Sequence, residues 1–363
     1  MRGLLRRLRR RAAAAGVGTA ALALLAGACG GAPSPPPATL SPAPPATSEP
    51  LAGDLRVETA GWNTDFSKHT VSLSEIESGG PGKDGIPAID APAFVPVEEA
   101  SGWLEPGEPV IELELGGEAW AYPLQVLIWH EIVNDTVAGT PVAVTFCPLC
   151  NTALAFDRRL DGRVLDFGTT GNLRNSDLVM YDRQTESWWQ QFGGVAIVGE
   201  LAGERLEQIP ARIVGWEDFA GRHPDGSVLS RETGHSRPYG RNPYVGYDSL
   251  DSPPIFAAAN PGDSRLLPKE RVAYVERGGE AVAVPFSALE REKTIAAVAG
   301  GEQLEFVWVP GVRSSLDEAS IPAGREVGSA LVRSALTGEL IPFDQPFWFA
   351  VAAFRPDVRI VRG

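Results

Sequence analysis

Two stretches of the sequence share one pattern, and this pattern decides the predicted fold. Residues 110–123 read VIELELGGEAWAYP, and residues 272–285 read VAYVERGGEAVAVP. In both stretches short runs of strand-forming residues flank a Gly-Gly turn, which is typical of two antiparallel strands. A proline ends each stretch, and a short apolar segment typical of a helix follows it. We therefore predict the same strand–turn–strand–helix unit twice.

The two copies keep nearly the same residue spacing beyond the predicted helix. Val137-Ala138-Gly139 recurs as Val298-Ala299-Gly300, which predicts a hairpin at the end of each copy. Chance similarity between two hairpins is the alternative, because Gly-Gly-Glu is a common turn. The predicted class is mainly β, a β-rich α+β fold with short helices, in which a first module (53–257) precedes a second, degenerate module (258–363). The second module has no cysteine and no histidine, so we expect the chemistry in the first.

The start of the chain has the pattern of an export signal. Five arginines within residues 6–11 precede an apolar run that ends in small residues before Cys29. We predict a signal peptide (1–28), exported by the general secretory or the twin-arginine route. Cys29 would then carry a lipid, anchoring the protein at the extracytoplasmic face of the cell membrane. An ordinary secretory signal, with Cys29 incidental, is the alternative. The Pro/Ala/Ser-rich segment 29–52 is predicted to be an extended tether.

The net charge of the chain argues against some classes of binding partner. The formal net charge is −14, and the predicted signal peptide holds six of the arginines and no acidic residue. Such an acidic chain lacks the basic footprint that binding to nucleic acid needs, so we expect no nucleic-acid partner. The same charge disfavours peripheral binding to anionic lipid, which leaves the predicted lipid on Cys29 as the contact with the membrane.

The remaining cysteines form a pair, Cys147-Pro148-Leu149-Cys150, near a predicted hairpin. Residues 131–137 and 141–146 have the pattern of strands joined by a tight turn. Extending this register places His130 opposite the cysteines, whereas alternation along the strand sends Glu131 to the other face. An imidazole beside a thiol can lower the thiol pKa and carry a proton. His130, Cys147 and Cys150 are therefore the predicted catalytic residues.

Three functions remain open for the cysteine pair. A redox couple would make the protein a possible thiol–disulfide oxidoreductase with an unknown redox partner or substrate. A metal site, with zinc or copper as the possible cofactor, would use Cys147, Cys150 and His130 with a further ligand. A permanent disulfide in a non-catalytic binding domain is the third, since two cysteines so close in an oxidising compartment can simply pin a loop.

Four longer motifs resemble a known family. They are GGPGKDGIP (79–87), HEIVND (130–135), TFCPLC (145–150) and SDLVMYDR (176–183). From about residue 65 to its end the chain resembles the domain-of-unknown-function 3179 family. That family is described as including selenoproteins, and the resemblance thereby implies redox chemistry at Cys147 and Cys150. Phe146 stands where tyrosine is usual in the family. Trp120 stands where arginine is usual, which weakens the expectation of an arginine-lined site.

Five further residues are candidates for substrate binding: Asp84, Asn172, Asp177, Tyr181 and Arg183. Asn172 and Asp177 belong to a dense polar segment (171–177) that the pattern predicts to be a turn before a strand. With Tyr181 and Arg183 it would line a pocket. The alternative is turn chemistry, in which such side chains satisfy local backbone groups. Asp84 follows Lys83 in a rigid turn, and it either bonds its own loop or approaches the thiols as a proton acceptor.

Overall fold

The computed structural model describes residues 56–363. The predicted signal peptide (1–28), the tether (29–52) and Cys29 lie outside the described residues. Strands dominate and the helices are short, which confirms the predicted β-rich class. Within residues 56–363, the helices are all too short or too polar to cross a membrane.

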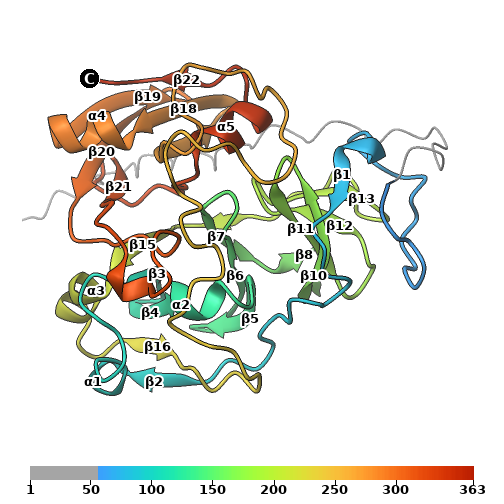
Figure 1. Cartoon of the computed structure of the whole chain (residues 1–363), viewed down its shortest axis with the longest axis horizontal. Coiled ribbons are helices and arrows are strands. Elements are labelled where there is room, and N and C mark those ends of the chain that lie inside the picture. Colours follow the sequence, from blue (N-terminus) through green and yellow to red (C-terminus); the bar gives the residue numbers. More distant parts are fainter. Residues whose placement is uncertain (1–55) are drawn as a thin grey trace, which may run out of the picture. The chain divides into compact units, whose positions relative to one another are not determined.

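The first copy of the repeat folds as its sequence predicts (Figure 1). Two antiparallel strands meet at Gly116 and Gly117, whose positive φ angles of 64° and 85° are readily adopted by glycine. A helix and a hairpin follow, and the hairpin turns at Ala138 and Gly139. The elements are β3 (Pro109–Leu115), β4 (Glu118–Pro123), α2 (Leu124–Leu127), β5 (Ile132–Val137) and β6 (Thr140–Cys147).

The second copy repeats these elements in the same order. Its first two strands are again antiparallel and turn at Gly278 and Gly279, with φ angles of 55° and 80°. The elements are β17 (Val272–Arg277), β18 (Glu280–Pro285), α4 (Phe286–Glu292), β19 (Thr294–Ala299) and β20 (Glu302–Val309). The duplicated strand–turn–strand–helix–hairpin module is therefore confirmed.

The duplication extends beyond the hairpins that were predicted. In the first copy β15 (Ala211–Gly215) pairs antiparallel with β3, and α3 (Trp216–Arg222) leads to β16 (Ser227–Leu229), which runs parallel to β4. In the second copy, residues 344–347 bridge β17 in the antiparallel sense. The helix α5 (Trp348–Phe354) then leads to β22 (Arg359–Ile360), which runs parallel to β18.

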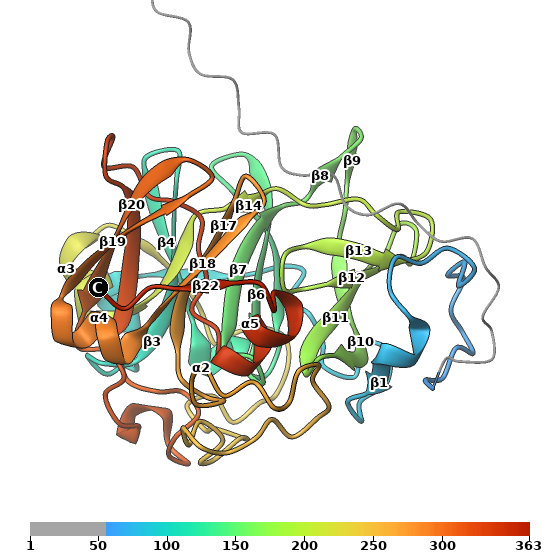
Figure 2. The ribbon, with the colours of Figure 1, turned by 90° about the horizontal axis from the view of Figure 1, so that it is seen from above.

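The first copy carries an insertion that the second lacks. Between β7 (Thr152–Asp157) and β15 the chain forms most of a five-stranded sheet in the order β1-β10-β11-β12-β13. Figure 2 shows this sheet beside β6 and β7, with the β8–β9 hairpin projecting from it. Its strands are β1 (Ile76–Ser78), β10 (Phe167–Arg174), β11 (Asp177–Asp182), β12 (Trp188–Gln190) and β13 (Val195–Val198). The other strands are β2 (Phe94–Pro96), β8 (Arg159–Leu160), β9 (Arg163–Val164), β14 (Gln208–Ile209) and β21 (Ser329–Ser334), and the other helices are η1 (Leu73–Glu75), α1 (Val97–Ala100) and η2 (Ile321–Ala323).

The two modules share a hydrophobic core. The largest buried cluster contains Phe146 and Phe156 of the first module together with Val312, Phe347 and Ala350 of the second. A separate apolar cluster fills the interior of the second copy. Burial of apolar surface thus joins residues on both sides of the predicted boundary at 257/258, and residues 56–363 fall within one compact unit.

Candidate functional site

The cysteine pair occupies the turn between β6 and β7. Cys147 is the last residue of β6 and pairs with Thr152, the first residue of β7. Asn151 closes the turn with a left-handed φ of 56°. Both cysteines are free thiols, with 1 % and 0 % of their surface exposed. The turn therefore holds both sulfurs inside the protein.

The second module holds this turn in place. The backbone N–H of Phe347 donates to the Cys150 carbonyl (2.8 Å), and the Asn151 side-chain amide donates to the Gln345 carbonyl (2.7 Å). The Ala153 N–H donates to Asp344 Oδ1 at 3.0 Å. Because these partners all lie in residues 344–347, the edge segment of the second copy fixes the turn that carries the thiols.

The inserted sheet supplies the groups that face the sulfurs. In the β10–β11 turn Asn175 and Ser176 both have left-handed φ angles, 55° and 60°, which cost non-glycine residues energy. This turn brings the Ser176 carbonyl within 3.2 Å of Cys150 Sγ and 3.9 Å of Cys147 Sγ, and both thiols donate to it. One oxygen of Asp177 and the two sulfurs lie within 4.8 Å of one another.

Asp177 is itself held by two short hydrogen bonds. Gln190 Nε2 and the Phe192 N–H donate to Oδ2 at 2.5 and 2.8 Å, and the Thr152 hydroxyl lies 3.4 Å from Oδ1. Burial nevertheless raises the Asp177 pKa to about 6, because it penalises the charged form more than these bonds favour it. The carboxylate is thus fixed in position beside the thiols.

The other acidic groups of the site also resist ionisation. Burial raises the pKa of both thiols, and the negative charge of Asp177 raises it further. Burial and the same aspartate raise the pKa of Glu131 to about 8, and Glu131 in turn acts on Cys147. Since like charges repel in a poorly hydrated site, both thiols and Glu131 favour their protonated forms, and a cation bound by the thiols would displace their protons.

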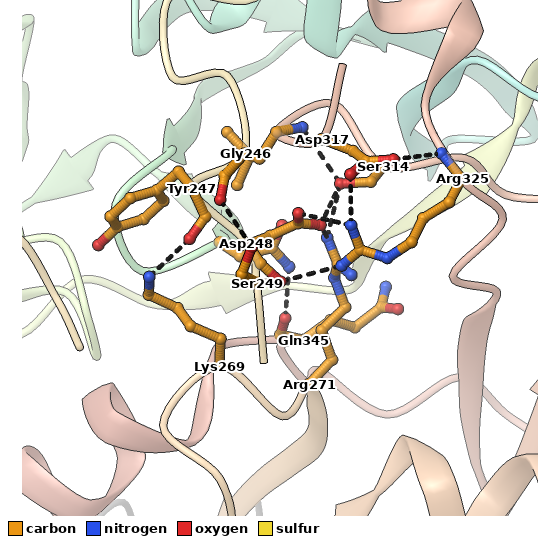
Figure 3. A network of polar contacts seen from close by, with 12 residues as sticks. Gly246, Tyr247, Asp248, Ser249, Lys269, Arg271, Ser314, Asp317, Arg325 and Gln345 are labelled. Atoms are coloured by element: carbon orange, nitrogen blue, oxygen red, sulfur yellow. Dashed lines mark hydrogen bonds and ion pairs between the residues drawn. The ribbon is translucent and has the colours of Figure 1, made fainter. Parts of the chain in front are cut away.

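A buried lysine borders the site. Lys269 is 1 % exposed, and its ammonium donates to the Tyr247 carbonyl (2.6 Å) and to the Ser252 hydroxyl (3.0 Å), as Figure 3 shows in part. Burial lowers its pKa to about 8, although Asp248 and Cys150 favour its charged form. The Tyr247 hydroxyl donates to the Leu149 carbonyl at 3.0 Å, between the two cysteines. Lys269 therefore supports the loop that covers the thiol turn.

The neighbouring residue of that loop, Asp248, anchors it to the second module (Figure 3). Its carboxylate is 1 % exposed and lies 3.1 Å from Arg271 Nη2 and 2.8 Å from Arg325 Nη1. Burial alone would raise the Asp248 pKa, but the two arginines and the Ser314 hydroxyl outweigh it and hold the pKa below its usual range. This buried ion network fixes residues 246–249 against the second module.

The His130 ring forms its hydrogen bonds with groups other than the thiols. Its Nδ1–H donates to the Pro87 carbonyl and its Nε2 accepts from the Tyr239 hydroxyl, both at 2.7 Å. The predicted ladder does not extend to His130, because α2 continues as turns to this residue and Glu131 adopts a left-handed φ of 60°. The ladder begins only at Ile132, opposite Thr145. Glu131, which alternation had sent to the opposite face, is the neighbour that acts electrostatically on Cys147.

The predicted substrate-binding residues divide into two groups. Tyr181 donates to Asp84 Oδ2 at 2.5 Å, and Arg183 lies 4.0 Å from the same aspartate, so these three form one cluster. Asn172 lies on β10 opposite Ser78, and Asp177 lies at the thiols. The predicted polar turn is mostly strand, because β10 runs to Arg174 with an irregularity before Asn172.

Ser176, Glu131 and Lys269 were not predicted as site residues. Ser176 and Lys269 come from segments far from the cysteines in sequence, so no local pattern could have paired them with Cys147 and Cys150. Glu131 is adjacent to a predicted residue. Its side-chain position depends on its left-handed φ angle, which the alternation of side chains along a regular strand does not predict.

Comparison with known proteins places the chain in a family. A family model described as "Protein of unknown function (DUF3179)" matches residues 83–358, which include the thiol turn, the insertion and most of both copies. No curated protein matched the chain, and no solved structure did. The family match covers well over half of the sequence, and the chain therefore belongs to the DUF3179 family.

Proposed function

We propose that this protein binds a metal ion at Cys147, Cys150 and Asp177, with zinc as the metal the donors suit best. The observation that carries the proposal is the convergence of two free thiols and a carboxylate oxygen within 4.8 Å of one another in a buried site. The Ser176 carbonyl, which both thiols approach, is available as a fourth donor. Sulfur and oxygen donors in such a set match zinc, whereas copper(I) favours sulfur alone.

The electrostatics of the thiol site favour the binding of a metal cation. The raised pKa values of Cys147, Cys150, Asp177 and Glu131 reflect burial of acids close to one another. A divalent cation removes this repulsion and displaces the thiol protons on binding, so affinity should rise with pH. The ammonium of Lys269 bonds to two carbonyls and a hydroxyl rather than to the sulfur of Cys150.

The test is metal content together with zinc affinity of the full chain in detergent. One zinc ion per chain is expected in the unmodified protein, and Cys147→Ser or Asp177→Asn should lose it. His130→Gln is the matched control, because the structure places this ring on Pro87 and Tyr239 rather than at the sulfurs. Metal retained in Cys147→Ser, or lost in His130→Gln with folding intact, would refute this ligand set.

A thiol redox function is the second candidate. Two free sulfurs that lie close together, on cysteines with two residues between them, can close to a disulfide by a small movement. One thiolate would attack a partner disulfide and the other would resolve the mixed disulfide, so that the partner gains two thiols. Burial and raised thiol pKa values work against the attacking step. In metal-free protein a potential above about −250 mV would favour this function, and one below about −300 mV would indicate a structural bridge.

We also propose that the protein is a lipoprotein held on the extracytoplasmic face of the membrane through Cys29. The support is the order of basic, apolar and small residues before Cys29. Labelled palmitate should enter the chain in cells, and Cys29→Ser should abolish the label. Retention of label in that variant would refute the anchor.

A further inference from the structure

A cavity of about 510 Å³ lies between the inserted sheet and the second copy. That volume is within the range of small-molecule sites in proteins. Residues of β12 and β13 and of the segment after them line one wall, and residues of β17, its Gly-Gly turn and α5 line the other. Neither the predicted catalytic residues nor the proposed metal ligands line this cavity.

Aromatic rings form part of the apolar lining of the cavity. Phe192 and Phe354 stack with their ring centres 4.7 Å apart, and Tyr274 lies 5.3 Å from Phe192. Phe343 also lines the cavity. Ring faces and edges of this kind favour a flat, apolar ligand body, because stacked and edge-to-face contacts add to the burial of apolar surface.

Arg205 supplies a positive charge without a carboxylate partner. Its Nη1 donates to the Gly193 carbonyl at 2.8 Å, and its buried Nε has no hydrogen-bond partner within residues 56–363. In the same part of the chain Arg205 forms no ion pair, whereas Arg174 and Arg355, which also line the cavity, are paired with Glu75 and Glu276. A half-buried guanidinium in an acidic protein is a ready partner for an anion.

Asp344 supplies an unsatisfied acceptor on the cavity lining. Its side chain is 4 % exposed, and Oδ1 accepts the N–H groups of Ala153 and Gln345. Oδ2 has no hydrogen-bond partner in the described part of the chain. A buried polar atom without a partner is costly, so a ligand N–H or O–H that reached it would be favoured.

From these features we infer that the cavity binds an aromatic organic acid, with Arg205 holding the acid group and Asp344 accepting a hydrogen bond from the ligand. The cavity is joined to the thiol site through two of its lining residues. Gln190 Nε2 and the Phe192 N–H are the donors that hold Asp177 Oδ2. A ligand that moves either residue therefore moves the aspartate beside the cysteines, although binding itself does not depend on the proposed metal site.

The test uses two fluorescent probes on the full chain in detergent. The first, 8-anilino-1-naphthalenesulfonate, has an acid group, flat rings and an N–H. The second, N-phenyl-1-naphthylamine, has the same rings and N–H without the acid. Arg205→Met should weaken binding of the first probe at least tenfold and change binding of the second less than twofold. Arg163→Gln is the matched control, because this arginine is half exposed and paired with Glu200 outside the cavity.

A second variant separates loss of the cavity from loss of the charge. Val195 lines the cavity on β13, so Val195→Phe should fill it and weaken both probes while Arg205 remains. Circular dichroism and the urea midpoint establish that each variant is folded. Equal affinity of the acidic probe in the unmodified protein and in folded Arg205→Met would overturn the inference, and so would an equal loss in Arg163→Gln. Persistence of both probes in folded Val195→Phe would show that they bind elsewhere.

Discussion

Replacing Asp248 by asparagine removes the charge that holds two arginines beside the thiol loop. The carboxylate is 1 % exposed and is bonded to Arg271, Arg325 and Ser314. Arg325 keeps a second carboxylate in Asp317, but Arg271, which is 8 % exposed, keeps only the Ser314 hydroxyl among these groups. The substitution therefore leaves a buried guanidinium without a counter-charge.

The expected loss follows from that unpaired charge. Removing one partner of a buried ion pair costs about 3–5 kcal/mol, because the remaining charge stays desolvated. A surface pair contributes about 0–1 kcal/mol, so Asp317→Asn is the matched control on the same Arg325. Replacing Arg271 by methionine as well removes the stranded charge, and Asp248→Asn/Arg271→Met should recover at least half of the lost stability.

Urea unfolding followed by tryptophan fluorescence measures the effect. With a slope of about 3 kcal/mol per molar urea, the midpoint of Asp248→Asn should fall by about 1 M or more. Because Tyr247 bonds to Leu149, loosening this loop should also speed reaction of the buried thiols with a maleimide. A midpoint shift no larger than that of Asp317→Asn, or no recovery in the double variant, would refute the account of this network.

Two further predictions concern a histidine and a glycine. Burial lowers the His130 pKa to about 4, so the unfolded chain gains a proton on this ring before the folded one, and stability should fall as pH drops from about 6.5 to 4. The loss at pH 5 relative to pH 8 should be about 1 to 2 kcal/mol smaller in His130→Gln, measured by urea unfolding, and an identical pH dependence would contradict the shift. A Cβ on Gly171 would lie 1.9 Å from the Pro81 carbonyl, whereas one on Gly162, with the same φ of 76°, would meet nothing within 4 Å. Thermal unfolding should therefore show Gly171→Ala to be less stable than Gly162→Ala by about 2 kcal/mol or more, and equal losses would show that the clash relaxes.

Much of the fold could be predicted because its decisive signals are local. The Gly-Gly turns at 116–117 and 278–279 require positive φ angles, and the strand patterns around them fix which residues pair. The repeat of β15, α3 and β16 by residues 344–347, α5 and β22 was missed, because the insertion breaks the constant spacing that relates the earlier parts of the two copies. Residues 209–225 and 341–357 nevertheless share Ile-Pro, a tryptophan and Pro-Asp at matching positions.

The site could be predicted only in part. The cysteines were evident from their spacing, and the sequence placed them correctly at the end of a hairpin strand. Their neighbours could not be assigned, because Ser176 and Asp177 reach the sulfurs through pairing of an inserted sheet. The ladder stops short of His130, since a single left-handed residue, Glu131, ends the periodicity on which the register argument depended.

The two copies of the repeat contribute unequally to the thiol site. The cysteines lie on the first copy and its insertion supplies their acidic neighbour, whereas the second copy holds the turn through residues 344–347. The chain is thus comparable to a dimer fused into one polypeptide, in which one protomer carries the thiols and the other supports the turn that holds them. Substitutions in the second copy would then affect the thiols only if they disturb the hydrogen bonds that residues 344–347 make with the turn. Substitutions in the first copy would affect the sulfurs and their acidic neighbour directly.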